Sequence, residues 1–159
     1  MTRSWFFTPA LLGVKESWRL ARWCVEHGAD EFTVRVLCAE DQGTRADQFE
    51  DAFDGRFVAT DLRRVVTAPE DEPERHVRLW RLDEEALQAL RAYLPDGLFT
   101  HRVDPQGWLE DLMLFRDGQL MLGVVTHQRE GMVRVTAEEL RELERIGFDF
   151  APEATAIRF

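Results

Sequence analysis

Three turn sequences between residues 98 and 147 constrain the fold of this chain more than any other feature. Asp-Pro-Gln-Gly at 104–107 has Pro second and Gly fourth in a four-residue turn, and Asp117-Gly118 is a favoured two-residue hairpin loop. The run 128–131 supplies a third, looser turn. The turns separate four segments of ordinary strand length, and they predict an antiparallel four-strand meander over about 98–135, with strands at 98–103, 108–116, 119–127 and 132–135.

A helix is predicted to close this meander. Thr136 followed three residues later by Glu139 is a capping box, in which the hydroxyl and the carboxylate each satisfy a backbone donor. Leu140, Leu143 and Ile146 then recur at helical spacing, and Gly147 is a natural stop for this helix.

The first two thirds of the chain alternate between helical and strand patterns. Periodicity predicts helices at 8–28, 44–55 and 83–94, and strands at 31–39, 56–60 and 75–82. Residues 61–67 fit either a longer strand or a helical turn, and the acidic, Pro-containing run 68–74 is expected to be an exposed loop. We therefore predict one α+β domain over 1–159, with a mainly antiparallel sheet packed by an N-terminal helix, two middle helices and the closing helix.

The composition disfavours some classes of function. The chain has 159 residues, a formal net charge of −10 and a pI near 4.9. This charge disfavours binding to nucleic acid or to an anionic membrane, since phosphate groups attract clustered positive charge, and it favours a basic partner or simply solubility. Lys15 is the only lysine among 20 cationic residues, a bias typical of GC-rich coding, so the many arginines do not by themselves indicate phosphate binding.

Cysteine content and hydropathy indicate the compartment. Cys24 and Cys38 have neither metal-ligand spacing nor a disulfide-rich context, which favours a reducing cytoplasm. The apolar run 5–14 is interrupted by Pro9 and Gly13 and lacks a small-residue cleavage site, so it is not expected to be a signal peptide. No run approaches the roughly 20 apolar residues of a membrane span. We expect a cytoplasmic protein with no membrane or nucleic-acid partner.

The three turns also assign side chains to the two faces of the meander. They predict three cross-strand pairs: Val103 with Trp108, Arg116 with Gln119, and His127 with Met132. One face is then an apolar core face, with Leu98, Leu109, Met113, Leu122, Val124, Val133 and Val135. Asp111 falls on this core face, where a buried carboxylate needs a partner such as Arg102 or Thr100. The alternative is a functional acid whose pKa is raised by burial.

The opposite face is predicted to bring together two histidines, one acid, one arginine and one tryptophan. It is predicted to carry His101, Trp108, Glu110, His127 and Arg134. Two histidines and a carboxylate on neighbouring strands are able to bind a metal, and a Glu–His pair is able to transfer a proton. Against this, no motif fixes their spacing, and charged cross-strand pairs are common on polar sheet faces. If the N-terminal helix covered this face, these groups would be buried supports rather than a site.

No phosphate-binding loop, nucleophile elbow, His-Glu-x-x-His helix or zinc-type Cys pair occurs in the sequence. We therefore predict a small acidic bacterial binding protein of the immunity or inhibitor type, which neutralises a more basic protein partner. Contact would be made through Trp108, Glu110, His127 and Arg134, without a cofactor or a metal. The alternative is an enzyme, either a hydrolase or a metal-dependent one, that uses His101, Glu110 and His127.

Overall fold

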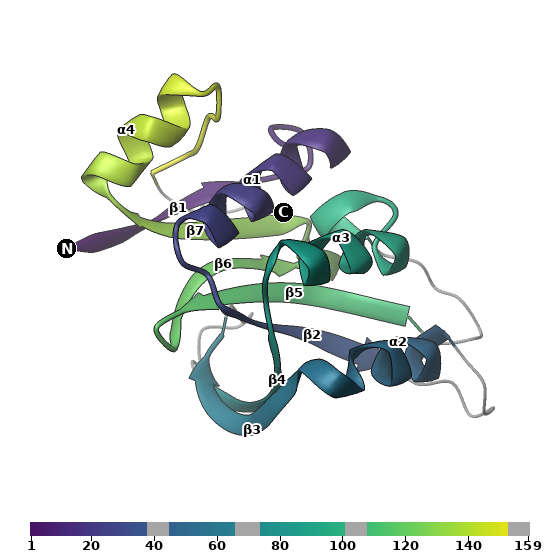
Figure 1. The fold of residues 1–159 in the computed structure, drawn as a ribbon. Helices are drawn as coiled ribbons and strands as arrows, with labels where there is room; N and C mark the ends of the chain where they lie inside the picture. Colours follow the sequence, from purple (N-terminus) through teal and green to yellow (C-terminus); the bar gives the residue numbers. More distant parts are fainter. Residues whose placement is uncertain (38–44, 66–73, 101–107, 153–159) are drawn as a thin grey trace.

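The computed structural model describes residues 1–37, 45–65, 74–100 and 108–152, and its main element is a seven-stranded antiparallel sheet (Figure 1). The spatial order of the strands is β1-β7-β6-β5-β2-β4-β3. In chain order the strands are β1 (Thr2–Phe7), β2 (Glu31–Leu37), β3 (Phe57–Arg64), β4 (Glu74–Arg81), β5 (Trp108–Arg116), β6 (Gln119–Val125) and β7 (Glu130–Thr136). The predicted α+β class with a mainly antiparallel sheet is confirmed.

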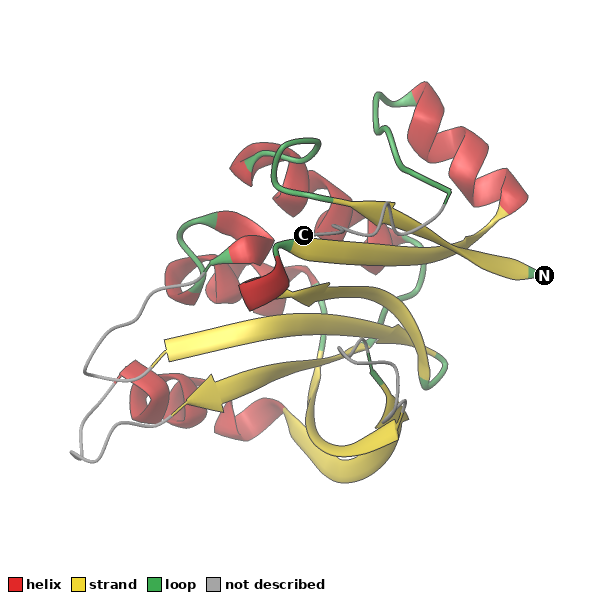
Figure 2. Cartoon of the chain, turned by 180° about the vertical axis from the view of Figure 1, so that it is seen from behind, coloured by secondary structure: helices red, strands yellow, loops and turns green. Residues whose placement is uncertain are grey.

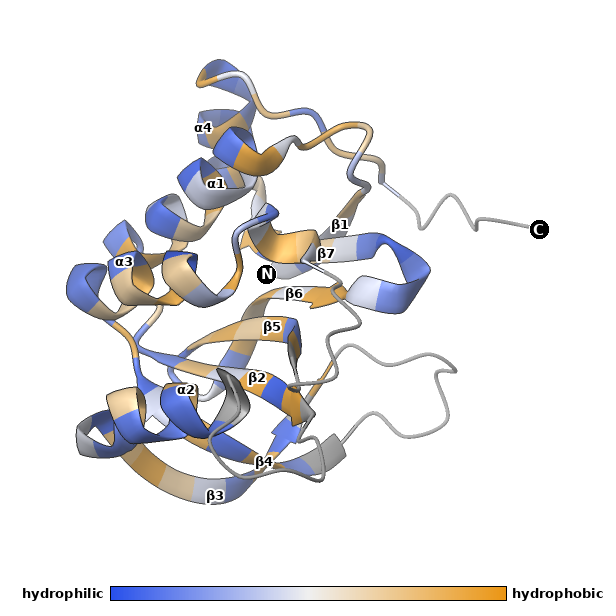
Figure 3. Cartoon of the chain, turned by 90° about the vertical axis from the view of Figure 1, so that its right-hand side faces the viewer, coloured by the Kyte–Doolittle hydropathy of each residue, from blue (hydrophilic) through white to orange (hydrophobic). Residues whose placement is uncertain are grey.

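The α-helices of the described ranges lie on one side of this sheet (Figure 3). They are α1 (Val14–Glu26), α2 (Arg45–Phe53), α3 (Glu84–Tyr93) and α4 (Ala137–Arg145). Three short 3₁₀ helices in these ranges connect elements: η1 (Asp54–Arg56), η2 (Gly97–Phe99) and η3 (Thr126–Gln128). None of the described helices combines the length and the apolar run that crossing a bilayer requires.

The main core lies between the helices and the sheet. The buried residues of α1 include Trp18, Leu20 and Ala21, and they belong to one hydrophobic cluster with the apolar face of the meander, at Leu109, Leu114, Leu122, Val124, Val133 and Val135. Glu110 follows Leu109 and points to the opposite face, where it pairs with Arg35. The N-terminal helix therefore covers the apolar face of the meander, not the face that carries Glu110.

An aromatic cluster joins α2 to the middle of the sheet. Phe49 and Phe53 are one helical turn apart in α2, and both are fully buried. The Phe49 ring centroid lies 5.3 Å from that of Trp80 in β4, and the Trp80 centroid lies 5.6 Å from that of Phe32 in β2. These contacts fix α2 over the β2–β4 pair.

The β3–β4 hairpin curls beneath the other face of the sheet (Figures 1 and 2). Its curl encloses a second, smaller cluster of buried apolar side chains, formed by Val65, Leu79, Met113, Phe115 and Leu120. Arg63 of β3 stabilises the curled hairpin through two ion pairs. Its Nη2 lies 3.2 Å from Glu31 Oε2 of β2, and its Nη1 contacts Asp61. Part of the helix-free face is therefore also a packed core.

Polar contacts attach α4 to the rest of the fold. The predicted capping box is present: Thr136 N donates to Glu139 Oε2 at 2.7 Å, and Glu139 N donates to Thr136 Oγ1 at 3.2 Å. Glu139 also pairs with Arg116 of β5, whose Nη1 donates to His27 O at 3.1 Å. Trp23, which the periodicity left off the buried stripe of α1, is buried against α4 and donates its Nε1–H to Glu142 at 3.1 Å.

Two parts of the predicted meander agree closely with the structure. The strand predicted at 108–116 has the same limits as β5, and Arg116 pairs with Gln119 as the hairpin predicts. Asp117 and Gly118 both have positive φ, 51° and 70°, as a two-residue hairpin turn of this kind requires. The sequence left residues 61–67 undecided, and β3 includes residues 61–64 of this segment, of which 66 and 67 lie outside the described residues.

The third predicted turn has the wrong register. β6 ends at Val125, which pairs with Glu130, so the predicted pair of His127 with Met132 is wrong by four residues along β7. Residues 126–128 form η3 instead, and Arg129 closes the connection with a φ of 55°. Gly131 was expected in the turn, but it lies within β7, where the buried ring of Phe7 packs on it and leaves no room for a Cβ.

The start of the predicted meander also differs. Residues 97–99 form η2 rather than a strand, and Leu98 N donates to Ser17 Oγ of α1 at 3.3 Å. The predicted strand residues 101–103 and the turn at 104–107 lie outside the described residues. In the described sheet, the outer neighbour of β7 is β1, which the sequence pattern did not predict.

The N-terminal segment was predicted as part of a longer helix. Thr8 instead begins a turn, in which Leu11 N and Leu12 N donate to Thr8 O at 3.0 Å, and α1 starts only at Val14. The acidic run predicted as an exposed loop at 68–74 lies outside the described residues except for Glu74, which begins β4.

Candidate functional site

Glu110 is the best defined of the predicted site residues. Its carboxylate Oε1 lies 3.1 Å from Arg35 Nη1 across the β5–β2 pair, and its side chain is only 6% exposed, whereas that of Arg35 is 56% exposed. A carboxylate this buried needs such a partner, because an unpaired charge would be costly away from water. The pair therefore has a clear structural role in joining β2 to β5.

Asp111 forms a bulge in β5 and changes the face assignment of the strand. Its φ is 55°, its Oδ1 accepts from Thr126 N at 2.7 Å, and its N donates to Thr126 Oγ1 at 3.0 Å. The prediction that it contacts Thr100 is wrong, because the Thr100 hydroxyl donates to Gly97 O; Arg102 lies outside the described residues. The extra residue places Met113 in the second cluster, on the face opposite Leu109, although the sequence predicted both on one face.

Arg134 lies far from Glu110 along the meander. The corrected register puts Glu130, not Arg134, opposite Val125, which moves Arg134 four residues or about 13 Å along β7. There its Nε donates to Thr2 Oγ1 at 3.3 Å, and it lines a hollow of about 170 Å³ with Leu120 and Met121. Glu110 and Arg134 therefore share a face of the sheet but not a contact patch.

The remaining predicted residues do not complete a catalytic group in the described part of the chain. His127 lies in η3 with an exposed side chain. Trp108 begins β5, and its backbone pairs with Leu37, but its side chain lies outside the description, as does the whole of His101. Among the described residues no group of three or more His, Cys, Asp or Glu could hold a metal ion.

Among the described residues, two acidic groups outside the prediction have a pKa raised above its ordinary value. Burial raises the pKa of the Glu130 carboxyl at the start of β7. Cys24 in α1 is fully buried, and burial raises the pKa of its thiol, so the thiol stays protonated at neutral pH and is a poor nucleophile.

The edge strand β3 exposes apolar side chains. Phe57, Val58 and Leu62 are 43%, 46% and 46% exposed. The preceding segment carries Asp51 and Asp54, which are exposed and have no cationic partner in the described ranges. We refer to Asp51, Asp54, Phe57, Val58 and Leu62 as the β3 edge. Sequence reasoning missed this surface because Phe57 and Val58 were assigned to a strand whose position in the sheet was unknown.

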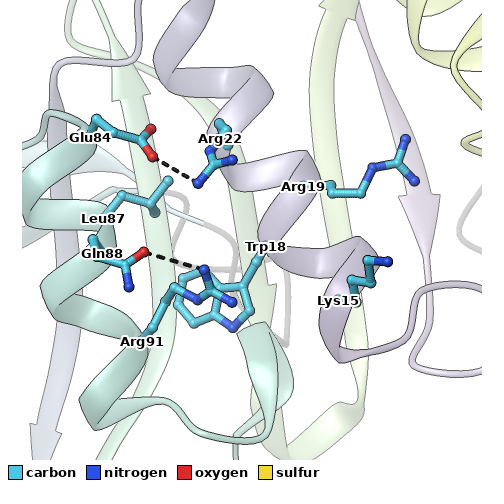
Figure 4. Close-up of a pocket in the computed structure, with 8 residues that line it drawn as sticks. All are labelled: Lys15, Trp18, Arg19, Arg22, Glu84, Leu87, Gln88 and Arg91. Atoms are coloured by element: carbon cyan, nitrogen blue, oxygen red, sulfur yellow. Dashed lines mark hydrogen bonds and ion pairs between the residues drawn. The ribbon is translucent and has the colours of Figure 1, made fainter.

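A groove with several cations lies between α1 and α3 (Figure 4). It encloses about 170 Å³ and is lined by Lys15, Trp18, Arg19, Arg22, Glu84, Leu87, Gln88 and Arg91. We call it the α1–α3 groove. The helical spacing of the cations at 15, 19 and 22 can be recognised in the sequence. The sequence does not show that α3 lies beside them.

The chain was compared with protein-family models, with curated proteins and with solved structures. No match was found. The functional proposals below therefore depend on the surfaces of the described residues, in particular the β3 edge and the α1–α3 groove.

Replacing Asp111 tests the bulge. Asp111→Ala should lower the free energy of unfolding by about 2 kcal/mol. It removes the hydrogen bond from the Thr126 amide, and it leaves an alanine at a positive φ without the carboxylate that stabilises this backbone conformation. Asp111→Gly, which tolerates the φ, should lose less, and Asp111→Asn, which retains an acceptor, should lose least. Urea denaturation of the three variants measures this order. Equal losses for all three would contradict the role given to the carboxylate.

Proposed function

We propose that this protein is a small, non-catalytic, cytoplasmic bacterial binding protein of the immunity or inhibitor type, which neutralises a more basic protein partner. The observation that carries the proposal is the β3 edge, where an edge strand with exposed apolar side chains follows closely in the chain after Asp51 and Asp54, two carboxylates without a cationic partner among the described residues. Exposed edge strands are common sites of strand addition by a partner, because their outward backbone groups are available for pairing.

The two edges of the sheet differ in a way that supports this choice. At β1, Phe6 exchanges two backbone hydrogen bonds of 2.9 Å with Ala151, so a later segment of the chain covers part of that edge. At β3, no described segment pairs with the outer side of the strand. The Leu62 N–H is occupied, since it donates to the neighbouring Asp61 carboxylate at 2.8 Å. A partner strand would therefore pair with the part of β3 that precedes Leu62.

Charge supports a basic partner for this edge. The neighbouring arginines are already bound to carboxylates: Arg56 to Asp83 and Glu85, and Arg78 to Glu50. Asp51 and Asp54 therefore add negative potential that no described cation neutralises. Together with the net charge of −10, this potential would speed the encounter with a basic protein and orient it. Of the residues predicted from the sequence as binding residues, Trp108, Glu110 and His127 remain a second candidate contact set, whereas the corrected register separates Arg134 from them.

The double variant Val58→Lys/Leu62→Lys tests the proposal. Both side chains are nearly half exposed, so we expect little change in stability and at least about a tenfold loss in recovery of a basic protein from a lysate of the source cells. Quantitative mass spectrometry of the captured proteins measures this loss. Leu11→Lys is the matched control, since Leu11 is 49% exposed and lies in the segment between β1 and α1.

Two outcomes would contradict the proposal. The first is equal recovery of every basic protein by the wild type and the β3 variant. The second is a stoichiometric metal in the purified protein that is lost in Glu110→Ala or His127→Ala, which would support the metal-dependent alternative.

A further inference from the structure

The α1–α3 groove concentrates positive charge in an otherwise acidic protein. Lys15, Arg19 and Arg22 come from α1 and Arg91 from α3, against a single lining carboxylate, Glu84. The whole chain has 20 cationic and 30 acidic residues, so four cations around one groove reverse the general balance. A local field of this sign attracts anions even when the net charge of the protein is negative.

Three of these cations are not neutralised within the described structure. Arg22 pairs with Glu84 at 2.9 Å across the top of the groove in Figure 4. Arg91 instead lies over the Trp18 ring, with its Cζ 5.8 Å from the ring centroid, and Arg19 donates to the backbone carbonyl of Ile146 at 3.0 Å. Lys15 is exposed and has no carboxylate partner among the described residues. Lys15, Arg19 and Arg91 are therefore available to carboxylates from outside.

The arrangement of the charges indicates the shape of the ligand. Lys15 and Arg22 are seven residues apart on α1, which corresponds to about 10 Å along the helix axis. Lys15 and Arg19 extend on the side of α1 away from Arg91, so the cationic groups are spread rather than converging on one point (Figure 4). A single phosphate is best held by convergent donors, whereas a spread row fits several carboxylates spaced along a peptide.

We propose that the α1–α3 groove binds an acidic peptide segment of another protein. The carboxylates of that segment would pair with Lys15, Arg19 and Arg91. A nucleic acid fits less well, because its continuous phosphate charge would be repelled by the net −10 of the chain over a longer length. This inference goes beyond the proposed function, since it concerns a different surface and the opposite sign of charge.

A titration with a short polyglutamate peptide tests the inference. We expect the amide resonances of α1 and α3 around the groove to shift, and the affinity to fall steeply between about 0.02 M and about 0.3 M NaCl. Lys15→Glu/Arg91→Glu should weaken binding at least about tenfold, because it reverses two exposed charges without removing an ion pair seen in the structure. Arg141→Glu, an exposed change of the same kind on α4, should weaken it by less than about twofold.

Several results would overturn the inference. Equal affinity of the groove variant and the wild type would do so, as would shifts confined to other elements. Tighter binding of inorganic phosphate or of a single-stranded oligonucleotide at the same amides would assign the groove to phosphate instead. The variant Val58→Lys/Leu62→Lys should bind polyglutamate like the wild type, so failure of the β3 proposal and failure of this one are distinguishable. Circular dichroism of each variant checks that it remains folded.

Discussion

Trp80→Ala is expected to lower the free energy of unfolding by about 3–5 kcal/mol, a large part of the stability of a domain of this size. Trp80 is 1% exposed and lies where β4, β2 and α2 meet. Its ring centroid lies within 6.4 Å of three aromatic rings, those of Phe32, Phe49 and Phe57. Truncation would leave a cavity that three rings held by separate elements cannot fill by small movements.

Urea denaturation followed by far-ultraviolet circular dichroism measures this loss, since that signal does not depend on the removed indole. Leu62→Ala is the control: Leu62 is 46% exposed on the edge of the same hairpin, and its truncation should cost less than about 0.5 kcal/mol. Similar losses for the two variants would contradict the packing of α2 against the β2–β4 pair.

Glu139→Gln is the second change with a large expected effect. Burial alone would raise the pKa of this carboxyl, but hydrogen bonds from Arg116 and from the Thr136 amide outweigh burial and lower the pKa to about 2. The side chain is only 16% exposed, so solvent screens these interactions weakly. A pKa lowered this far from its ordinary value near 4.5 corresponds to about 3 kcal/mol of stability at neutral pH.

The sign of the pH dependence follows from the lowered pKa. The unfolded chain binds the proton more tightly than the folded one, so the contribution is complete above about pH 4.5 and is lost as the pH falls towards 2. Urea midpoints measured between about pH 3 and pH 7 should fall more steeply at the acid end for the wild type than for Glu139→Gln. Glu138→Gln, an exposed neighbour in the same helical turn, should keep the steep dependence. Identical acid profiles for Glu139→Gln and the wild type would rule out this role.

Local signals in the sequence predicted local structure well. The Asp117-Gly118 turn and the Thr136–Glu139 capping box each satisfy their backbone requirements within a few residues, and both are present in the structure. The prediction failed where one strand depends on a distant one. Gly131 is a turn residue by composition, but the Phe7 ring packs on it, and Phe7 is 124 positions earlier in the chain. The bulge at Asp111 depends in the same way on Thr126, which begins η3 directly after the neighbouring strand β6.

The candidate site was predicted less well than the fold. A shift of four residues in an antiparallel pair keeps every side chain on its face but changes its neighbours, so Arg134 stayed on the predicted face and lost its predicted contact with the Glu110 region. The β3 edge and the α1–α3 groove depend on which strand ends the sheet and on which helices lie side by side. Neither property can be obtained from turn residues or from periodicity.

The pairing of β1 with β7 has a consequence for how the chain assembles as it is made. Among the described strands, β1 is synthesised first and β7 last, and Thr2 lies opposite Thr136 in the ladder. On a ribosome, β1 therefore has no strand partner until the rest of the sheet has emerged. During that time its aromatic side chains Trp5, Phe6 and Phe7 lack the packing that the completed sheet provides. We therefore expect sheet closure at this edge to be a late step of folding, because the two paired strands lie at opposite ends of the described chain.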